Sequence, residues 1–387
     1  MTSLRLPQAD GTWLEHTLGE APLWQHPRGP ITSRIAFAAA HVVADRFGET
    51  VPGAPAAVDW EATLAFRRHL FSWGLGVAEA MDTAQRGMGM DWVATQELIR
   101  RSASQAKDAG VRIAAGAGTD HLPAAVPDLG AVLRGYEEQL AVVEDAGAQP
   151  ILMASRHLAA IAEGPDDYLA VYSRLLQQAG QPVILHWLGA AFDPALDGYW
   201  GSIDVPTATA TVLDLIKQHT DKIDGIKVSL LDADHEKRLR AELPQGVRLY
   251  TGDDFNYPEL IRGDGTHHSD ALLGVFAAIP AAASAALQAL DRGDRAAYDA
   301  AFAPTLELAR HLFAAPTYYY KTGIAFLAWL NDLQPAFAMV GGLHSARSAV
   351  HLAEVFRLAD RAGALIDPEH AADRLRVFLA ASMGVIA

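Results

Sequence analysis

The chain has 387 residues, of which half are hydrophobic, and its formal net charge is −15. This length suits one large α/β barrel with additions, or two domains. The negative charge argues against nucleic acid or an anionic membrane as a main partner, because both require clustered lysine and arginine, and the absence of cysteine excludes disulfides, thiolate nucleophiles and cysteine-bound metals.

The N-terminal residues lack the apolar segment of a secretion signal, and no run of about 18 apolar residues occurs. We therefore expect neither secretion nor a membrane span, and predict a cytoplasmic protein. Residues 1–30 contain Trp13, Trp24 and three prolines. They are expected to form an irregular N-terminal extension with at most a short hairpin.

From residue 35 onward the sequence repeats one pattern: an apolar strand-like run, a polar or glycine-rich loop, and a helix. Helices are expected from Asp59, Asp91 and Asp166 and over 132–146. The expected strands lie at 35–44, 76–81, 112–118, 149–154, 181–188, within 224–232, at 247–251 and at 271–276.

Eight strand–helix alternations over roughly 260 residues are typical of a (β/α)8 barrel rather than of an open sheet. The region after residue 281 shows only helical periodicity, with prolines as breaks. We therefore predict an α/β fold: an N-terminal extension (1–30), a (β/α)8 TIM barrel (31–295) and a C-terminal helical segment (296–387).

The sixth expected strand contains a lysine where a buried strand is normally apolar. Asp224 and Gly225 form a turn, and Lys227 lies inside the apolar run that follows. Burial disfavours the ammonium form, so the pKa of such a lysine falls and its neutral amine can attack carbonyl groups. Lys227 is thus a candidate Schiff-base lysine; the structural alternative is a lysine whose stem lies along the sheet and whose head reaches solvent or a carboxylate.

Polar residues gather where the expected strands end, which is where barrel enzymes place their chemistry. About half of them are expected to be ordinary loop residues. The set comprises His41, Asp45, Asp82 to Arg86, Asp120, His121, Arg156, His157, His186, Lys227, Ser229, Asp253, Asp254, His267, His268 and Asp270.

Four segments carry a family resemblance: Pro182-Val183-Ile184-Leu185-His186, Gly225-Ile226-Lys227, Thr251-Gly252-Asp253-Asp254 and Ala289-Leu290-Asp291-Arg292-Gly293-Asp294. They resemble strands five and six, the loop after strand seven and the C-terminal region of the dihydrodipicolinate synthase and N-acetylneuraminate lyase family of class I aldolases. Gly116-Ala117-Gly118 is more faintly similar. The resemblance spans 32–330 and is best over 180–300, and it identifies the chain as a divergent branch of that superfamily, of the kind described as a domain of unknown function.

The resemblance implies a TIM barrel in which Lys227 forms an imine with a 2-oxo acid, and a homo-oligomer assembled through helices around the barrel. His186 replaces the family's proton-relay tyrosine and can still transfer a proton. The family's Gly-Thr-Thr-Gly-Glu loop, which grips the substrate carboxylate, is replaced by a loop of different composition that contains Asp82, Thr83, Gln85 and Arg86, and Ser155-Arg156-His157 replaces a tyrosine-rich loop.

We therefore predict a lyase that forms a Schiff base with a 2-oxo acid or a keto-sugar-like small molecule. The expected catalytic residues are Lys227, His186 and Asp253, although Asp253 or Asp254 also suits a helix cap. The expected substrate-binding residues are Asp82, Thr83, Gln85, Arg86, Arg156, Ser229 and Asp254. Arg86 and Arg156 are the cations best suited to grip a carboxylate.

Two other functions remain open. A divalent metal held by histidine and aspartate, for example His121, His186 and His267 with Asp120, would also polarise a carbonyl, but no local metal motif supports it and no metal is expected. The barrel could instead bind a ligand without turnover. No glycine-rich phosphate loop follows the first strand, so no nucleotide, flavin or other cofactor is expected.

Two further segments allow more than one interpretation. The aromatic stretch 316–323 suits buried helix packing, or it lines the mouth of the barrel or a subunit interface. The long loop 193–202 suits a lid that exposes Tyr199 and Trp200, or a loop packed on its own barrel.

Overall fold

A computed structural model describes residues 2–384. Eight parallel strands close into a barrel in the order β10-β3-β4-β5-β6-β7-β8-β9, which confirms the predicted (β/α)8 fold. The strands are β3 (Ala36–Ala39), β4 (Gly76–Glu79), β5 (Ile113–Ala117), β6 (Gln149–Leu152), β7 (Val183–Leu188), β8 (Ile223–Ser229), β9 (Arg248–Thr251) and β10 (Asp270–Leu273).

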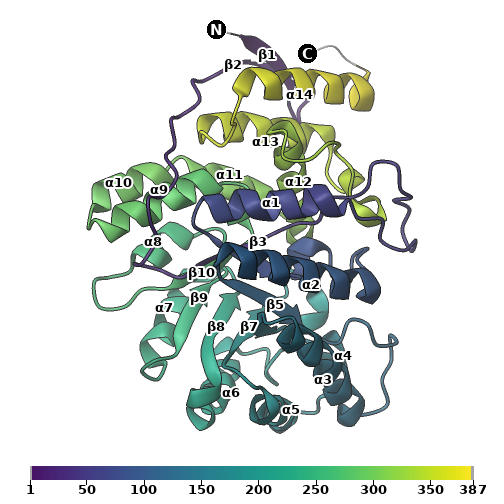
Figure 1. Cartoon of the computed structure of the whole chain (residues 1–387), viewed down its shortest axis with the longest axis vertical. Helices are drawn as coiled ribbons and strands as arrows, with labels where there is room; N and C mark the ends of the chain where they lie inside the picture. Colours follow the sequence, from purple (N-terminus) through teal and green to yellow (C-terminus); the bar gives the residue numbers. More distant parts are fainter. Residues whose placement is uncertain (1, 385–387) are drawn as a thin grey trace.

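Helices follow the strands and pack around the barrel (Figure 1). They are α1 (Trp60–Ser72), α2 (Trp92–Ala109), α3 (Leu129–Asp145), α4 (Arg156–Ile161), α5 (Pro165–Gln178), α6 (Val205–Gln218), α7 (Ala233–Glu242), α8 (Tyr257–Arg262) and α9 (Pro280–Asp291). Many begin in the same way: an aspartate before the helix accepts a hydrogen bond from a backbone N–H of the first turn, as Asp59, Asp91 and Asp204 do.

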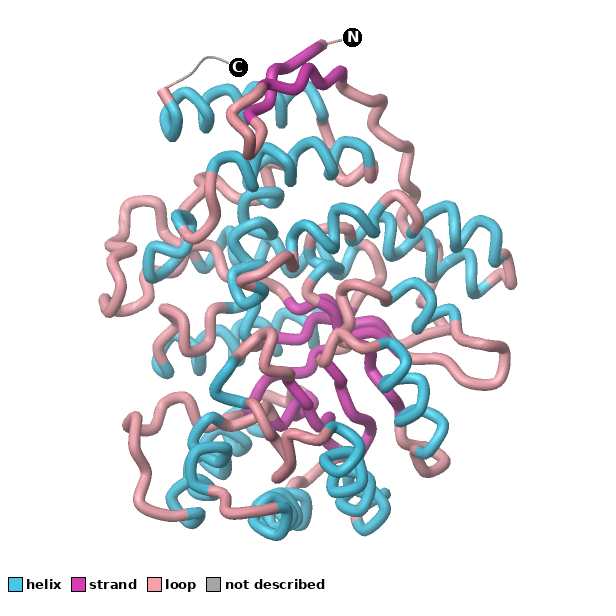
Figure 2. The backbone as a smooth tube through the Cα atoms, turned by 180° about the vertical axis from the view of Figure 1, so that it is seen from behind, coloured by secondary structure: helices cyan, strands magenta, loops and turns pink. Residues whose placement is uncertain are grey.

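The C-terminal residues form a second helical layer. It contains α10 (Arg295–Phe302), α11 (Thr305–Leu312), α12 (Tyr320–Leu330), α13 (Ala349–Arg361) and α14 (Pro368–Met383). The N-terminal extension forms the hairpin β1 (Ser3–Pro7) and β2 (Trp13–Thr17), which packs against α13 through buried Leu4 and Leu6. Figure 1 shows this hairpin beside α14 at one end of the molecule, and Figure 2 shows the barrel strands below the stacked C-terminal helices.

Apolar side chains fill the centre of the barrel. They include Phe37, Ala78, Ile151, Ile184 and Leu272. Polar residues occur further along the same strands, where the loops begin. None of the helices within the described residues combines the length and apolarity that a membrane span needs.

Several strand boundaries differ from the expectation. The first barrel strand ends at Ala39, because Val43, Ala44 and Asp45 bond to the segment before α1 instead of extending the sheet. His267 and His268 precede β10, and Asp270 is its first residue, so their predicted place at a strand end was wrong and they lie at the opposite face of the barrel.

The loop after β7 also differs from one of its two interpretations. Tyr199 and Trp200 are buried, and the Tyr199 hydroxyl accepts a hydrogen bond from the Ser155 backbone. The loop therefore packs on its own barrel and does not expose these rings.

Candidate active site

Lys227 points into the barrel near the carboxyl end of β8, level with His186 of β7 and Tyr250 of β9. It is only 6% exposed. Burial lowers the pKa of its amine, although the nearby carboxylates of Asp82 and Asp254 oppose this effect. A lowered pKa makes the neutral, nucleophilic form of this buried amine more accessible than that of an exposed lysine.

Gly252 makes room for this lysine. A Cβ at position 252 would lie 2.2 Å from Ser229 Oγ and 2.8 Å from Lys227 Cε. The glycine of the Thr251–Asp254 segment therefore allows the loop after β9 to pass directly beside the lysine stem.

The two aspartates after Gly252 have different surroundings. Asp253 accepts hydrogen bonds from the backbone of Phe255 and from both the backbone and the side chain of Asn256, so both of its carboxylate oxygens hold the turn before α8. Asp254 accepts a single hydrogen bond, from Val275 N at 2.8 Å. Its charge also acts on Lys227, whose pKa it raises. Burial raises the pKa of Asp254, which favours the neutral acid. Of the two aspartates, Asp254 is therefore the one that can exchange a proton with the Lys227 amine.

His186 lies beside Lys227 and shares a 3.3 Å hydrogen bond with Ser229 through Nε2. Its Nδ1 is buried without a partner among the described residues. Burial, reinforced by the charge of Lys227, lowers the pKa of His186 well below its usual value. The ring is therefore neutral at physiological pH and has one nitrogen free to face a ligand.

The loop after β4 places Asp82 and Thr83 at the mouth of the barrel, where they meet α12. The Tyr320 hydroxyl donates to Asp82 Oδ2 at 2.9 Å and shares a 2.5 Å hydrogen bond with Thr83 Oγ1. The next residue, Lys321, places its Nζ 3.9 Å from Asp82 Oδ2. Asp82 thus lies electrostatically between two buried lysines, Lys227 and Lys321.

Gln85 and Arg86 hold this loop rather than face the amine. Gln85 Nε2 donates to the backbone carbonyls of Val340 and Met88. All five N–H groups of Arg86 are used, and their acceptors are Asp120, Gln139 and the carbonyls of Ala80 and Gly116. This geometry leaves Arg86 no free donor for a substrate carboxylate.

Arg156 is the first residue of α4 and lies at the rim, where it pairs with Asp193. The side chain is half exposed, unlike that of Arg86. It is therefore the predicted arginine that solvent and a substrate can still reach.

No three histidine, aspartate or glutamate side chains within residues 2–384 are grouped as metal ligands. His121 instead contacts Gln139 and Glu138. It follows β5, whereas His186 lies in β7 and the remaining two histidines precede β10.

The sequence matches the family model described as "Protein of unknown function (DUF993)" over residues 4–385, almost the whole chain. The chain belongs to the DUF993 family. No curated protein is significantly similar to it.

The fold of this DUF993 protein is that of dihydrodipicolinate synthases. The enzyme from Acinetobacter baumannii, solved with pyruvate, has a TM-score of 0.64 and 16% identity over 87% of this chain and all of its own. The enzyme from Aquifex aeolicus has a TM-score of 0.61 and 13% identity, over 90% of this chain and 97% of its own. 4-Hydroxy-tetrahydrodipicolinate synthase from Methylacidiphilum fumariolicum has a TM-score of 0.64 and 14% identity, over 87% of this chain and 99% of its own.

Sequence reasoning about the DUF993 chain missed Tyr320 and Lys321 as site residues. The stretch 316–323 does pack as a helix, but its first two helical side chains also reach the barrel mouth. The available signal was a second lysine in an apolar, aromatic segment. Burial lowers the pKa of Lys321 to about 8, the same effect that the sequence predicts for Lys227.

Proposed function

We propose that the protein is a lyase that forms a Schiff base between Lys227 and a small 2-oxo acid. The observation that carries this proposal is the place of Lys227: a buried amine with a lowered pKa, inside a (β/α)8 barrel and close to the neutral acid Asp254. The likeness to dihydrodipicolinate synthases, one of them solved with pyruvate, supports the choice of a 2-oxo acid.

In the proposed reaction the Lys227 amine attacks the substrate carbonyl carbon. The carbonyl oxygen takes one proton from the amine and one from an acid, and leaves as water. Asp254 is the group suited to supply the second proton, because its raised pKa keeps it protonated near neutral pH. The resulting protonated imine then accepts the electron pair of a C–C bond that breaks, or of a C–H bond at the adjacent carbon as a base removes the proton. In the second case the enamine so formed expels an oxygen leaving group, which departs with the electron pair of its C–O bond.

Proton exchange with solvent has a path through Tyr320, Thr83 and Asp82. Their hydrogen bonds lead from the buried interior to Asp82, whose side chain is 20% exposed. His186, level with Lys227 on the neighbouring strand, offers a second acceptor. We assign Asp253 the structural task of holding its turn and Asp254 the acid role.

Lys321 favours an anionic substrate over a neutral keto sugar. Its ammonium group is fully buried, and its one hydrogen-bond partner among the described residues is the weak acceptor Met88 Sδ at 3.2 Å. A buried ammonium with unused N–H groups is stabilised by a carboxylate. Arg156 adds a second cation at the rim.

Trapping with cyanoborohydride tests the proposal. We expect pyruvate and other 2-oxo acids to leave a reduced adduct on Lys227, found by intact mass and peptide mapping, and none on Lys227→Ala. Lys321→Met is the matched variant: it should still form the adduct on Lys227, but at a 2-oxo acid concentration about tenfold or more higher. An adduct that maps to Lys321, or that persists in Lys227→Ala, would contradict the assignment.

The rate of trapping should rise with pH as Lys227 loses its proton, and it should fall again above about pH 8, where Asp254 loses the proton that it supplies. Because burial lowers the pKa of this amine, the midpoint should lie below 10.5, the ordinary value for lysine. A midpoint at or above that value would show that the amine is solvated and not activated. The rate is measured at fixed pyruvate concentration across the pH range in which the protein stays folded.

A further inference from the structure

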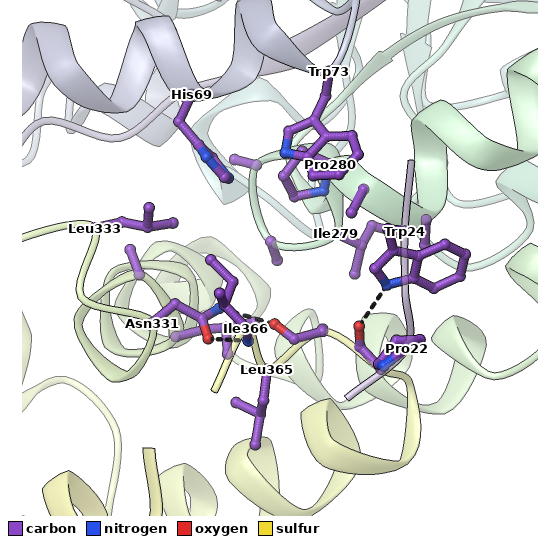
Figure 3. A pocket seen from close by; sticks show the side chains of 18 of the residues that line it. Pro22, Trp24, His69, Trp73, Ile279, Pro280, Asn331, Leu333, Leu365 and Ile366 are labelled. Carbon is purple, nitrogen blue, oxygen red and sulfur yellow. Dashed lines mark hydrogen bonds between the residues drawn. The ribbon is translucent and has the colours of Figure 1, made fainter. Parts of the chain in front are cut away.

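A hollow of about 260 Å³ lies between the N-terminal extension, α1, the segment after β10 and the C-terminal helices. It shares no residue with the candidate active site. Figure 3 shows its walls, with the side chains of His69 of α1 and of Trp73, the residue that follows α1, projecting toward the hollow. The main wall residues are Trp24, His69, Trp73, Ile279, Ala328 and Leu333.

The described walls carry no formal charge. Within residues 2–384, no aspartate, glutamate, lysine or arginine lines the hollow. Burial lowers the pKa of His69 to about 4, so its imidazole is neutral at physiological pH. A charged ligand would lose its hydration here without meeting an opposite charge, which is strongly unfavourable.

The shape of the walls suits a flat molecule. Two indole rings contribute, and His26 stacks on Trp73 with ring centroids 3.8 Å apart. Trp24 is fixed by a 2.9 Å hydrogen bond from Nε1 to the carbonyl of Gly363. A cavity of about 150 Å³ already holds benzene, so this volume accepts one or two fused rings.

His69 supplies a free polar group. Of the other polar wall side chains, Asn331 donates to Ala364 O and accepts from Ile366 N, and His26 shares a 2.9 Å hydrogen bond with Ser72 O through Nδ1. Trp73 Nε1 is buried without a partner within residues 2–384, so it is a second donor open to a ligand. The His69 ring has no hydrogen bond to any residue in 2–384, although it lines the hollow. A neutral imidazole can donate from one nitrogen and accept at the other.

The entrance is apolar as well. Leu23 is 97% exposed and Ile366 is 57% exposed, and both line the rim. Exposed large apolar side chains around a concave site are typical of ligand-binding surfaces.

We propose that this hollow is a binding site for a small, uncharged, aromatic or heteroaromatic molecule that hydrogen-bonds to His69 and packs between the tryptophan walls. The site is separate from the Lys227 chemistry and does not depend on it.

Isothermal titration with indole, a flat and uncharged two-ring probe, tests this site on the full chain. We expect a dissociation constant below about 1 mM and at least about tenfold weaker binding of indole-3-acetate, its anionic relative. No heat of binding with indole, or equal affinity for both probes, would overturn the proposal.

Variants locate the binding. Ala328→Phe fills the hollow from α12 and should weaken indole binding by about tenfold or more, whereas Ala300→Phe, the same change on the exposed side of α10, should leave it unaltered. If the filled variant does not fold, His69→Phe keeps a flat ring and removes the hydrogen bond, which should weaken indole about tenfold. Unchanged affinity in a folded Ala328→Phe or in His69→Phe would refute the site.

Discussion

The space that the Lys227 side chain occupies exists because residue 252 has no Cβ. Gly252→Ala should therefore displace the lysine stem or the loop after β9. We expect pyruvate trapping to slow by about tenfold to a hundredfold, since small displacements of reacting groups cost this much, and the free energy of unfolding to fall by about 1–3 kcal/mol from overpacking. Trapping rates and urea unfolding measure the two effects.

Gly164→Ala is the control for this substitution. Residue 164 precedes α5 in an extended conformation, and a Cβ there would meet no atom within 4 Å. Trapping by this variant should equal that of the wild type, with stability within about 0.5 kcal/mol. If Gly252→Ala behaves in the same way, the close approach of the loop to Lys227 is not needed for the chemistry.

At the scale of elements, one buried ion pair fixes β4 against α1. Arg67 donates to both carboxylate oxygens of Glu79 at 2.8 Å, and neither side chain is exposed. Arg67→Met leaves Glu79 buried without a counter-charge and should cost about 3–5 kcal/mol in urea unfolding. The double variant Arg67→Met/Glu79→Gln should recover part of this loss.

Arg101→Ala is the comparison for this ion pair. It removes an ion pair to Glu97 in which both side chains are well exposed, and it should change stability by no more than about 1 kcal/mol. Equal losses of unfolding free energy in Arg67→Met and Arg101→Ala would show that burial does not increase the cost of breaking an ion pair.

A buried histidine joins the loop after β3 to the C-terminal helical segment. His41 shares a 2.7 Å hydrogen bond with Gln334, and burial lowers the pKa of His41 to about 4. The unfolded chain binds the proton more readily, so the stability that His41 contributes is complete above about pH 6.5 and is lost as the pH falls toward 4. The stability difference between wild type and His41→Gln, measured by urea unfolding, should shrink by about 3 kcal/mol over this range. A difference that does not vary with pH would contradict the burial of a neutral ring.

On the scale of the whole molecule, the barrel and the C-terminal helices should unfold together. Gln334, Val340 and Tyr320 each bond to the barrel loops, at His41, Gln85 and Asp82. Separate unfolding would leave these buried polar groups unpaired. We expect one transition, with superimposable curves from tryptophan fluorescence and circular dichroism; two resolved transitions would mean that the C-terminal segment folds independently.

The alternation of strands and helices made the barrel predictable, because buried parallel strands leave near-continuous apolar runs in the sequence. The same pattern located Lys227, His186, Ser229 and Asp254, which lie on or just after their strands. It misplaced His267, which precedes its strand in the chain and therefore lies at the amino end of that strand, away from the face where barrel enzymes place their chemistry. The sequence pattern did not predict Tyr320 and Lys321 as site residues, because their role depends on how α12 packs across the mouth of the barrel. The spacing of residues along the chain does not contain that information.

The origin of Tyr320 and Lys321 in α12 has a consequence for the protein during its synthesis. A ribosome completes the strand that bears Lys227 well before it reaches these two residues, an interval of roughly 5 to 20 s at ordinary elongation rates. A nascent barrel therefore has the nucleophile but neither the buried cation nor the tyrosine that joins Asp82 to Thr83. The proposed active site is therefore incomplete while the chain is being made, and its second lysine and its tyrosine arrive only when α12 docks.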